Sequence, residues 1–180
     1  MSSPEEDATL LSPENQQKLD SAQMIIQGAI ATGDMTWLSE LPSIDTKEIL
    51  NSIHMPKDAG DYATDIERIL RRIPDGWGRW ISCDAGWYPL VIKLDKQLAT
   101  IMPEYKVHQV KEKYGTLRYY CDATDEMEEL IAATEIESSK TCEICGALGE
   151  ICVKNYWYKT LCNTCATTNG YAPDPELDTP

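Results

Sequence analysis

Apolar residues recur at helical spacing through the first part of the chain. Ser12 followed by proline is a typical helix start, because the hydroxyl caps free N–H groups and proline fits the first turn. Apolar positions three and four residues apart follow, and Gly33 is a typical stop. Capping-box patterns predict two further helices, beginning at Asp45 and at Thr64. Residues 12–75 are therefore predicted to form a helical region.

The pattern changes in the middle of the chain. Pro89 opens a stretch in which leucine and isoleucine are spaced for one buried helix face. β-Branched and aromatic residues then lie on both sides of the segment Lys113-Tyr-Gly-Thr116, which predicts a β-hairpin. A strongly acidic helix is predicted from Asp122 or Thr124 to about Ser139. Residues 76–139 are thus predicted to form a central α+β core.

Both ends of the chain are polar and rich in acidic residues. Residues 1–11 are predicted to be a flexible acidic arm, and residues 172–180 a flexible tail. The apolar runs are too short to span a membrane, and the N-terminus lacks the basic and apolar parts of a secretory signal. We therefore expect a cytoplasmic protein that has no membrane partner.

The charge of the chain is strongly negative and unevenly distributed. The sequence carries 30 acidic and 16 basic residues, a formal net charge of −14. Residues 61–120 have a net charge of +2, whereas the segments before and after them have −7 and −9. This balance disfavours general binding of duplex DNA through a basic surface. It favours a partner protein that presents a basic surface.

Four of the seven cysteines give the strongest chemical signal in the sequence. They form two Cys-x-x-Cys pairs with 16 residues between them: Cys142, Cys145, Cys162 and Cys165. This spacing is typical of a four-cysteine zinc site, because each pair can direct both sulfurs at one ion. We expect one structural Zn²⁺, since four protein ligands leave no coordination position for water.

Residues 140–171 are predicted to form a module around this zinc site. The segment between the pairs has the pattern of a β-hairpin, and the second pair begins a short helix, so a treble-clef or zinc-ribbon-like module is expected. Two disulfides, or four unrelated core thiols, are the alternatives, and a cytoplasmic chain disfavours disulfides. The remaining cysteines are expected to be ordinary buried thiols: Cys83, Cys121 and Cys152.

Cations and aromatic residues alternate in the predicted hairpin. Lys111, Lys113, Arg118 and Tyr114 have the composition of a face that binds single-stranded nucleic acid. A solvated strand face, with its tyrosines turned inward, explains the same composition.

Three tryptophans, Trp77, Trp80 and Trp87, lie close together before the central helix. They fit either a stacking platform for a ligand or packing in the core. Packing is favoured because the chain has no phenylalanine to supply aromatic bulk.

Acidic residues cluster at the start of the predicted acidic helix. Asp125, Glu126, Glu128 and Glu129 are the candidates for contact with a basic partner. The same residues also suit a solvated helix start, where carboxylates interact favourably with the helix dipole.

The sequence contains only weak catalytic patterns. Asp75 and Glu104 fit the nuclease string Pro-Asp…Glu-x-Lys, but Asp75 lies in a glycine turn and Glu104 follows a proline rather than a strand. Neither histidine lies in the four-cysteine segment, so an HNH-type nuclease would lack its general base there. The sequence therefore predicts a protein that is not an enzyme.

Three segments together carry a resemblance to known proteins. They are GWYPLV at 86–91, VKEKYGTLRYY at 110–120, and the four-cysteine unit from Thr141 to Cys165. Over about residues 76–168 the chain resembles small uncharacterised proteins encoded by bacteriophages and prophages. The resemblance implies a phage or prophage origin and a bacterial host cytoplasm. By analogy, it suggests binding to, and inhibition of, a host nucleic-acid-handling or defence protein.

The segment Cys142–Cys165 alone also resembles the zinc finger of DksA/TraR-type transcription factors. That resemblance implies an alternative function, as a nucleic-acid-binding or transcription-associated zinc-finger protein. Those factors contain a long coiled-coil hairpin, which the prolines and glycines between positions 74 and 103 would interrupt here. The expected fold is α+β, with a helical N-terminal region, a central helix plus hairpin, and the C-terminal zinc module.

Overall fold

The computed structural model describes residues 10–174; residues 1–9 and 175–180, which hold most of the predicted arm and tail, lie outside the described residues. Within residues 10–174 the chain forms the predicted α+β fold, with two three-stranded sheets. The helices are α1 Pro13–Thr32, α2 Thr46–Asn51, α3 Ala63–Arg71, α4 Tyr88–Ile101, α5 Asp125–Ser138 and α6 Asn163–Asn169. The strands are β1 Ile81–Ser82, β2 Val107–Lys113, β3 Thr116–Cys121, β4 Glu150–Lys154, β5 Trp157–Leu161 and β6 Ala172–Pro173. Across this part of the chain, no helix combines the length and the apolar character needed to cross a membrane.

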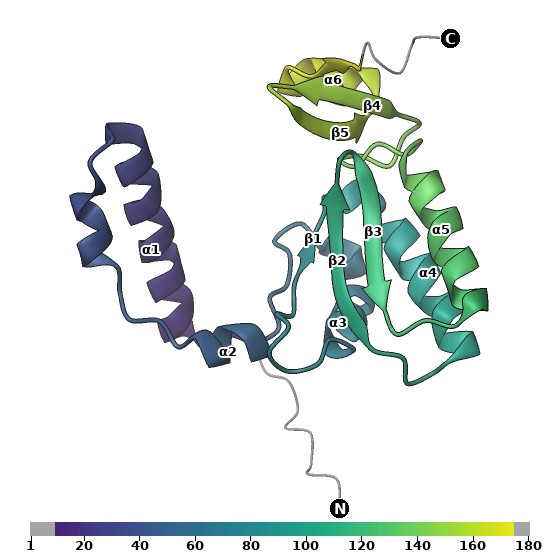
Figure 1. The fold of residues 1–180 in the computed structure, drawn as a ribbon, viewed down its shortest axis with the longest axis horizontal. Coiled ribbons are helices and arrows are strands. Elements are labelled where there is room, and N and C mark those ends of the chain that lie inside the picture. The colour runs from purple at the N-terminus through teal and green to yellow at the C-terminus, as the bar shows by residue number, and fades with distance from the viewer. Residues whose placement is uncertain (1–9, 175–180) are drawn as a thin grey trace, which may run out of the picture.

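The first two helices begin and end where their capping residues predict. The Ser12 hydroxyl accepts an N–H group of the first turn of α1, and Gly33 ends that helix in the left-handed conformation. Asp45 caps α2 in the same way. Glu48 of α2 accepts the N–H of Ser12 at 3.0 Å, which holds α2 against the start of α1. Figure 1 shows α1 standing apart from the main body, to which α2 connects it.

The capping box predicted at Thr64 is wrong, although a helix is present. α3 begins one residue earlier, at Ala63, and no side chain caps it. A 3₁₀ helix, Gly60–Tyr62, runs directly into α3, and the N–H of Ala63 bonds to the carbonyl of Gly60. Because this turn already satisfies the first N–H groups, α3 needs no hydroxyl cap.

The predicted hairpin forms the centre of the first sheet. β2 and β3 are antiparallel and joined by the two-residue turn between Lys113 and Thr116. β1 pairs in parallel with β2, with Ile81 opposite Val110. The sequence did not predict β1, because two residues are too few to show a strand period.

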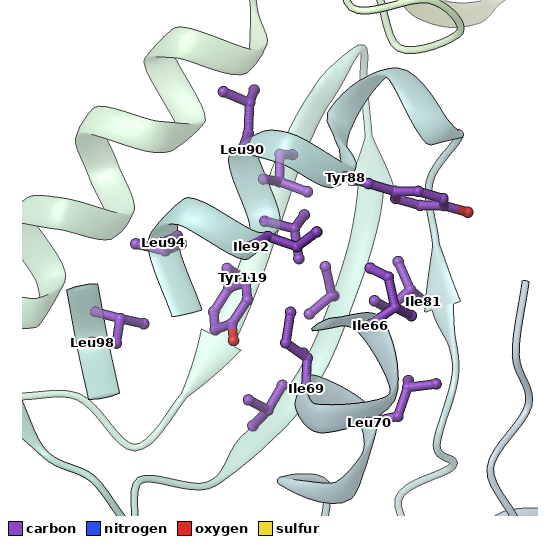
Figure 2. Close-up of a cluster of buried hydrophobic side chains, with 14 of the residues drawn as sticks. Ile66, Ile69, Leu70, Ile81, Tyr88, Leu90, Ile92, Leu94, Leu98 and Tyr119 are labelled. Atoms are coloured by element: carbon purple, nitrogen blue, oxygen red, sulfur yellow. The ribbon is translucent and has the colours of Figure 1, made fainter. Parts of the chain in front are cut away.

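One face of this sheet packs against α3 and α4 to form the main hydrophobic core. Figure 2 shows Ile66 and Ile69 of α3 in one buried cluster with Tyr119 of β3 and the apolar side chains of α4. Leu94 of α4 is fully buried in the same cluster. Helix α5 extends the core along the edge of β3, where the N–H of Leu117 donates to the hydroxyl of Ser138 at 2.9 Å.

The three tryptophans occupy different environments. Trp87 is fully buried in the main core, as the packing interpretation predicts. Trp80 is half-buried and meets the His54 ring edge-on at 5.7 Å. Trp77 is 58% exposed and stacks on His108 at 4.9 Å. Core packing therefore accounts for Trp87 but not for Trp77.

Candidate metal centre

The C-terminal module is built from a knuckle, a hairpin and a short helix, as the sequence predicts. Cys142 and Cys145 lie in a turn after α5, and β4 and β5 form the antiparallel hairpin that follows. Helix α6 begins directly after Cys162. Residues 172 and 173, which the sequence assigns to the tail, pair with β4 as the short strand β6. Figure 1 shows this module at the tip of the β2–β3 hairpin.

The structure brings the four predicted cysteines together. Their sulfur atoms all lie within 4.8 Å of one another, and those of Cys145 and Cys162 are 3.7 Å apart. A tetrahedral zinc ion with Zn–S bonds of about 2.3 Å requires S···S separations of about 3.8 Å. Among residues 10–174, no other group of three or more Cys, His, Asp or Glu side chains is close enough to hold a metal ion.

The backbone around the first pair forms a tight knuckle. Gly146 follows Cys145 in the left-handed conformation, with φ of 75°, and its N–H donates to the carbonyl of Cys142 at 2.8 Å. The N–H of Cys142 in turn donates to the carbonyl of Ala147 at 2.7 Å. These two bonds close the turn that directs both sulfurs to the same side.

The second pair uses the start of α6. Cys162 is the N-cap residue, and its sulfur accepts the N–H of Cys165 at 3.4 Å. This hydrogen bond lowers the pKa of Cys162 to about 7. A thiol that is readily deprotonated suits metal binding, because zinc binds the thiolate.

The donor set determines what a bound zinc ion would do. Cys142 is fully buried, whereas Cys145 is exposed and the other two cysteines are half-buried. Four thiolates complete the tetrahedral coordination of zinc and leave no position for water or substrate. The residues therefore fit a structural zinc, which would stabilise the module rather than activate a water molecule.

Glu143, between the first two cysteines, joins this knuckle to the main body. Its side chain is only 1% exposed and pairs with Lys159 of β5 at 2.8 Å. Lys159 also pairs with Asp84 at 2.9 Å, and the N–H of Asp84 donates to Glu143 at 3.3 Å. Burial raises the pKa of Glu143, and Lys159 opposes that rise. Sequence patterns do not predict this network, because its members are up to 75 residues apart.

Gly86 and Trp87 form the surface on which the knuckle rests. The N–H of Gly86 donates to the carbonyl of Glu143 at 2.8 Å, and the indole N–H of Trp87 donates to the carbonyl of Thr141 at 2.6 Å. A methyl group at position 86 would clash with the carbonyl oxygens of Cys142 and Glu143. Glycine is therefore required there for the close approach of the two backbones.

The other three cysteines lie outside the centre. Cys152 is buried beneath it, and Cys83 and Cys121 are half-buried beside the main core, so the prediction of buried thiols holds fully only for Cys152. Burial raises the pKa of Cys121 to about 11 and that of Cys83 further. Such thiols stay protonated and unreactive at neutral pH.

The four acidic candidates all lie on the exposed surface at the start of α5. Asp125, Glu126, Glu128 and Glu129 form no ion pair within residues 10–174. Thr124 caps the helix before them, as predicted.

The residues of the alternative nucleic-acid face divide into two groups. Lys113 and Tyr114 are exposed at the hairpin tip, and Lys111 lies over the Tyr120 ring at 5.6 Å. Arg118 is half-buried and pairs with Glu135 of α5 at 3.3 Å. Its charge is therefore neutralised within the protein.

The two nuclease candidates have separate surroundings. Asp75 pairs with Arg79 at 2.8 Å in the turn after α3, and Glu104 is exposed in the loop that follows α4. Neither belongs to a cluster of metal ligands within the described residues.

Comparison with known proteins adds no relative. No protein-family model matches this chain, and searches of curated proteins and of solved structures found no match.

Proposed function

We propose that this chain is a non-enzymatic zinc protein that acts by binding another protein. The closed set of four thiolates supports a structural rather than a catalytic metal. The surface that supports protein binding is the start of α5, where Asp125, Glu126, Glu128 and Glu129 are exposed and unpaired.

The contrast within α5 carries this proposal. Glu135 and Glu137, near the end of the helix, pair with Arg118 and Lys93. The four carboxylates of the first two turns have no such partner among residues 10–174. A concentrated, unneutralised negative surface favours association with a basic partner and speeds the encounter.

The class of partner follows from the resemblance to phage and prophage proteins. A host protein that handles nucleic acid, or that belongs to a defence system, presents a basic surface where nucleic acid normally binds. An acidic phage protein that occupied this surface would inhibit such a host protein. This mode of inhibition is proposed by analogy with other acidic phage proteins.

Affinity purification of the full-length chain from a bacterial host, with identification of the bound proteins, tests the proposal. We expect a basic nucleic-acid-handling protein as the partner, released by added salt because exposed charges are screened. Recovery of the chain without any partner contradicts the proposal.

Two variants with equal loss of charge make this test specific. The first carries Asp125→Asn, Glu126→Gln, Glu128→Gln and Glu129→Gln, and it should lose the partner. The control carries Asp20→Asn, Glu40→Gln, Asp61→Asn and Glu104→Gln, which neutralise four exposed carboxylates on other elements, and it should keep the partner. Equal loss from both variants would mean that only net charge matters, and the α5 surface would be excluded.

A further inference from the structure

Two hairpin turns carry tyrosine in an unusual backbone conformation. Tyr114 and Gly115 join β2 to β3, with φ of 54° and 76°. Asn155 and Tyr156 join β4 to β5, with φ of 51° and 67°. Positive φ at both positions of a two-residue loop is the pattern of a type I′ turn.

Tyrosine is a poor residue for such positions. Type I′ turns favour Asn-Gly, because asparagine and glycine tolerate the left-handed region and bulky side chains do not. Strained residues of this kind are concentrated at functional sites. Here both strained tyrosines project into solvent: Tyr114 is 70% and Tyr156 is 94% exposed. Neither gains core packing in return for the strain.

The turn of the first hairpin packs against the second hairpin, and both turns line one cleft. The hydroxyl of Thr160 in β5 donates to the carbonyl of Gly115 at 2.5 Å, which fixes one hairpin on the other. The Tyr114 ring then meets the Tyr158 ring edge-on at 6.5 Å. Trp157, next to Tyr156, is 74% exposed. A cleft of about 510 Å³ lies between the hairpins and is lined by Glu112, Lys113, Tyr114, Tyr156, Trp157 and Tyr158.

Strand β2, which borders this cleft, carries two lysines that have no carboxylate partner in the described part of the chain, although the protein is acidic. Lys113 lies over the Tyr114 ring at 5.6 Å, and neither Lys113 nor Lys111 pairs with a carboxylate within residues 10–174. Glu112 is the one acidic residue in the lining, and its carboxylate already accepts the N–H of Gly115 at 2.6 Å. In the zinc module itself, Lys159 is neutralised by Glu143 and Asp84.

We propose that this aromatic cleft binds single-stranded nucleic acid. Bases stack on the exposed rings of Tyr114, Tyr156 and Trp157, and Lys111 and Lys113 neutralise the adjacent phosphates. Exposed rings beside unpaired lysines match the two chemical features of a single strand, its base faces and its phosphates. A duplex offers its phosphates but not its base faces, because its bases are stacked on each other. The proposed site is separate from the acidic surface of α5 and does not depend on its function.

Fluorescence anisotropy with the zinc-loaded full-length chain tests this inference. The probes are labelled oligo-dT and oligo-rU of about 15 nucleotides and a duplex of the same length. We expect one or both single strands to bind at least about tenfold more tightly than the duplex, with affinity falling as salt rises. Equal binding of duplex and single strands, or no binding of either strand, overturns the proposal. So does binding of a proline-rich peptide in place of both strands, since aromatic clefts also hold such peptides.

Two substitutions separate binding from folding. Tyr114→Asn and Tyr156→Gly each create the Asn-Gly sequence that a type I′ turn prefers, so the hairpins should form at least as well as in the wild type. Each should weaken binding about five- to 100-fold, which corresponds to the loss of one base stacked on an aromatic ring. Wild-type affinity in both variants overturns the proposal.

Lys113→Gln tests the phosphate contact, and two variants outside the cleft serve as controls. Lys113→Gln should reduce the slope of log affinity against log salt by about 0.7, the value for one phosphate contact on a single strand. Lys47→Gln removes the same charge from α2, and Leu148→Ser removes an exposed apolar side chain from the zinc module. Both controls should bind as the wild type does. An unchanged slope for Lys113→Gln, or an equal change for Lys47→Gln, contradicts the assignment of this lysine.

Discussion

Replacement of Lys159 by methionine tests the buried ion pair that Lys159 forms with Glu143 of the zinc knuckle. Lys159→Met keeps the length of the side chain and removes its charge. Glu143 then remains buried, at 1% exposure, without its cation. Removal of one partner of a buried ion pair costs about 3–5 kcal/mol. Glu143 keeps the hydrogen bond from the N–H of Asp84, and such a bond to a charged group contributes about 1.5 kcal/mol. We therefore expect a loss of about 1.5–3.5 kcal/mol in the free energy of unfolding.

The assay is urea unfolding of the zinc-loaded protein near neutral pH, with two variants for comparison. The side chain of Asp84 is 45% exposed, so water screens its charge and Asp84→Asn should cost less than about 1 kcal/mol. The double variant Glu143→Gln with Lys159→Met should recover much of the stability that Lys159→Met loses, because no buried charge is left unpaired. If Lys159→Met unfolds within about 0.5 kcal/mol of the wild type, the buried pair does not hold the knuckle.

The same variant has a characteristic pH dependence. Burial raises the pKa of Glu143 and Lys159 opposes this rise, so removal of the lysine raises the pKa further. A carboxyl whose folded pKa is raised destabilises the fold only above its ordinary pKa of 4.5, where the unfolded chain is ionised. The unfolded chains titrate alike, so the stability difference between Lys159→Met and the wild type should widen as pH rises through the folded-state pKa of Glu143, which lies above 4.5, and narrow as pH falls below it. A difference that is independent of pH contradicts the assignment to Glu143.

Three further predictions concern other contacts. Tyr114→Asn should raise the melting temperature by about 2–4 °C in a thermal scan, because it relieves about 1 kcal/mol of backbone strain at a residue with positive φ. A melting temperature below that of the wild type would argue against this strain. Gly86→Ala should destabilise the protein by about 1–3 kcal/mol, because the added methyl group clashes with the knuckle. The same variant should release zinc to a chelator faster than the wild type. Gly33→Ala is the control: it adds a methyl group where no atom lies within 4 Å, and it should leave zinc release unchanged. The pKa of Glu48 is lowered chiefly by its hydrogen bond from Ser12, so this contact stabilises α1 at pH values above 4.5 and is lost as pH falls through the lowered pKa. The protection of the Ser12 amide against hydrogen exchange, relative to the intrinsic rate at each pH, should fall over that range in the wild type but not in Glu48→Gln.

The features that sequence predicts well here are those set by neighbouring residues. Ser12 and Gly33 bound α1 because caps and stops act over a single turn. The two Cys-x-x-Cys pairs define a module because each pair is a local turn, and the hairpin between them needs no distant contact. The Tyr-Gly turn of the β2–β3 hairpin is equally local.

The features that sequence missed depend on contacts between distant segments. Glu143 resembles any acidic residue between two cysteines until Lys159 and Asp84 are brought to it by the fold. Tyr156 and Trp157 carry no binding signal of their own, because the cleft exists only where the second hairpin meets the first. The capping box at Thr64 failed for a related reason, since the 3₁₀ helix before it already satisfies the start of α3.

X-ray absorption at the zinc edge, on protein purified without added metal, tests the central claim most directly. One zinc per chain should be present, with four sulfur ligands at about 2.3 Å and no nitrogen or oxygen ligand. Metal content well below one per chain across several preparations would contradict a structural zinc. An oxygen ligand at about 2.0 Å would also contradict it, because the coordination would then be open to water.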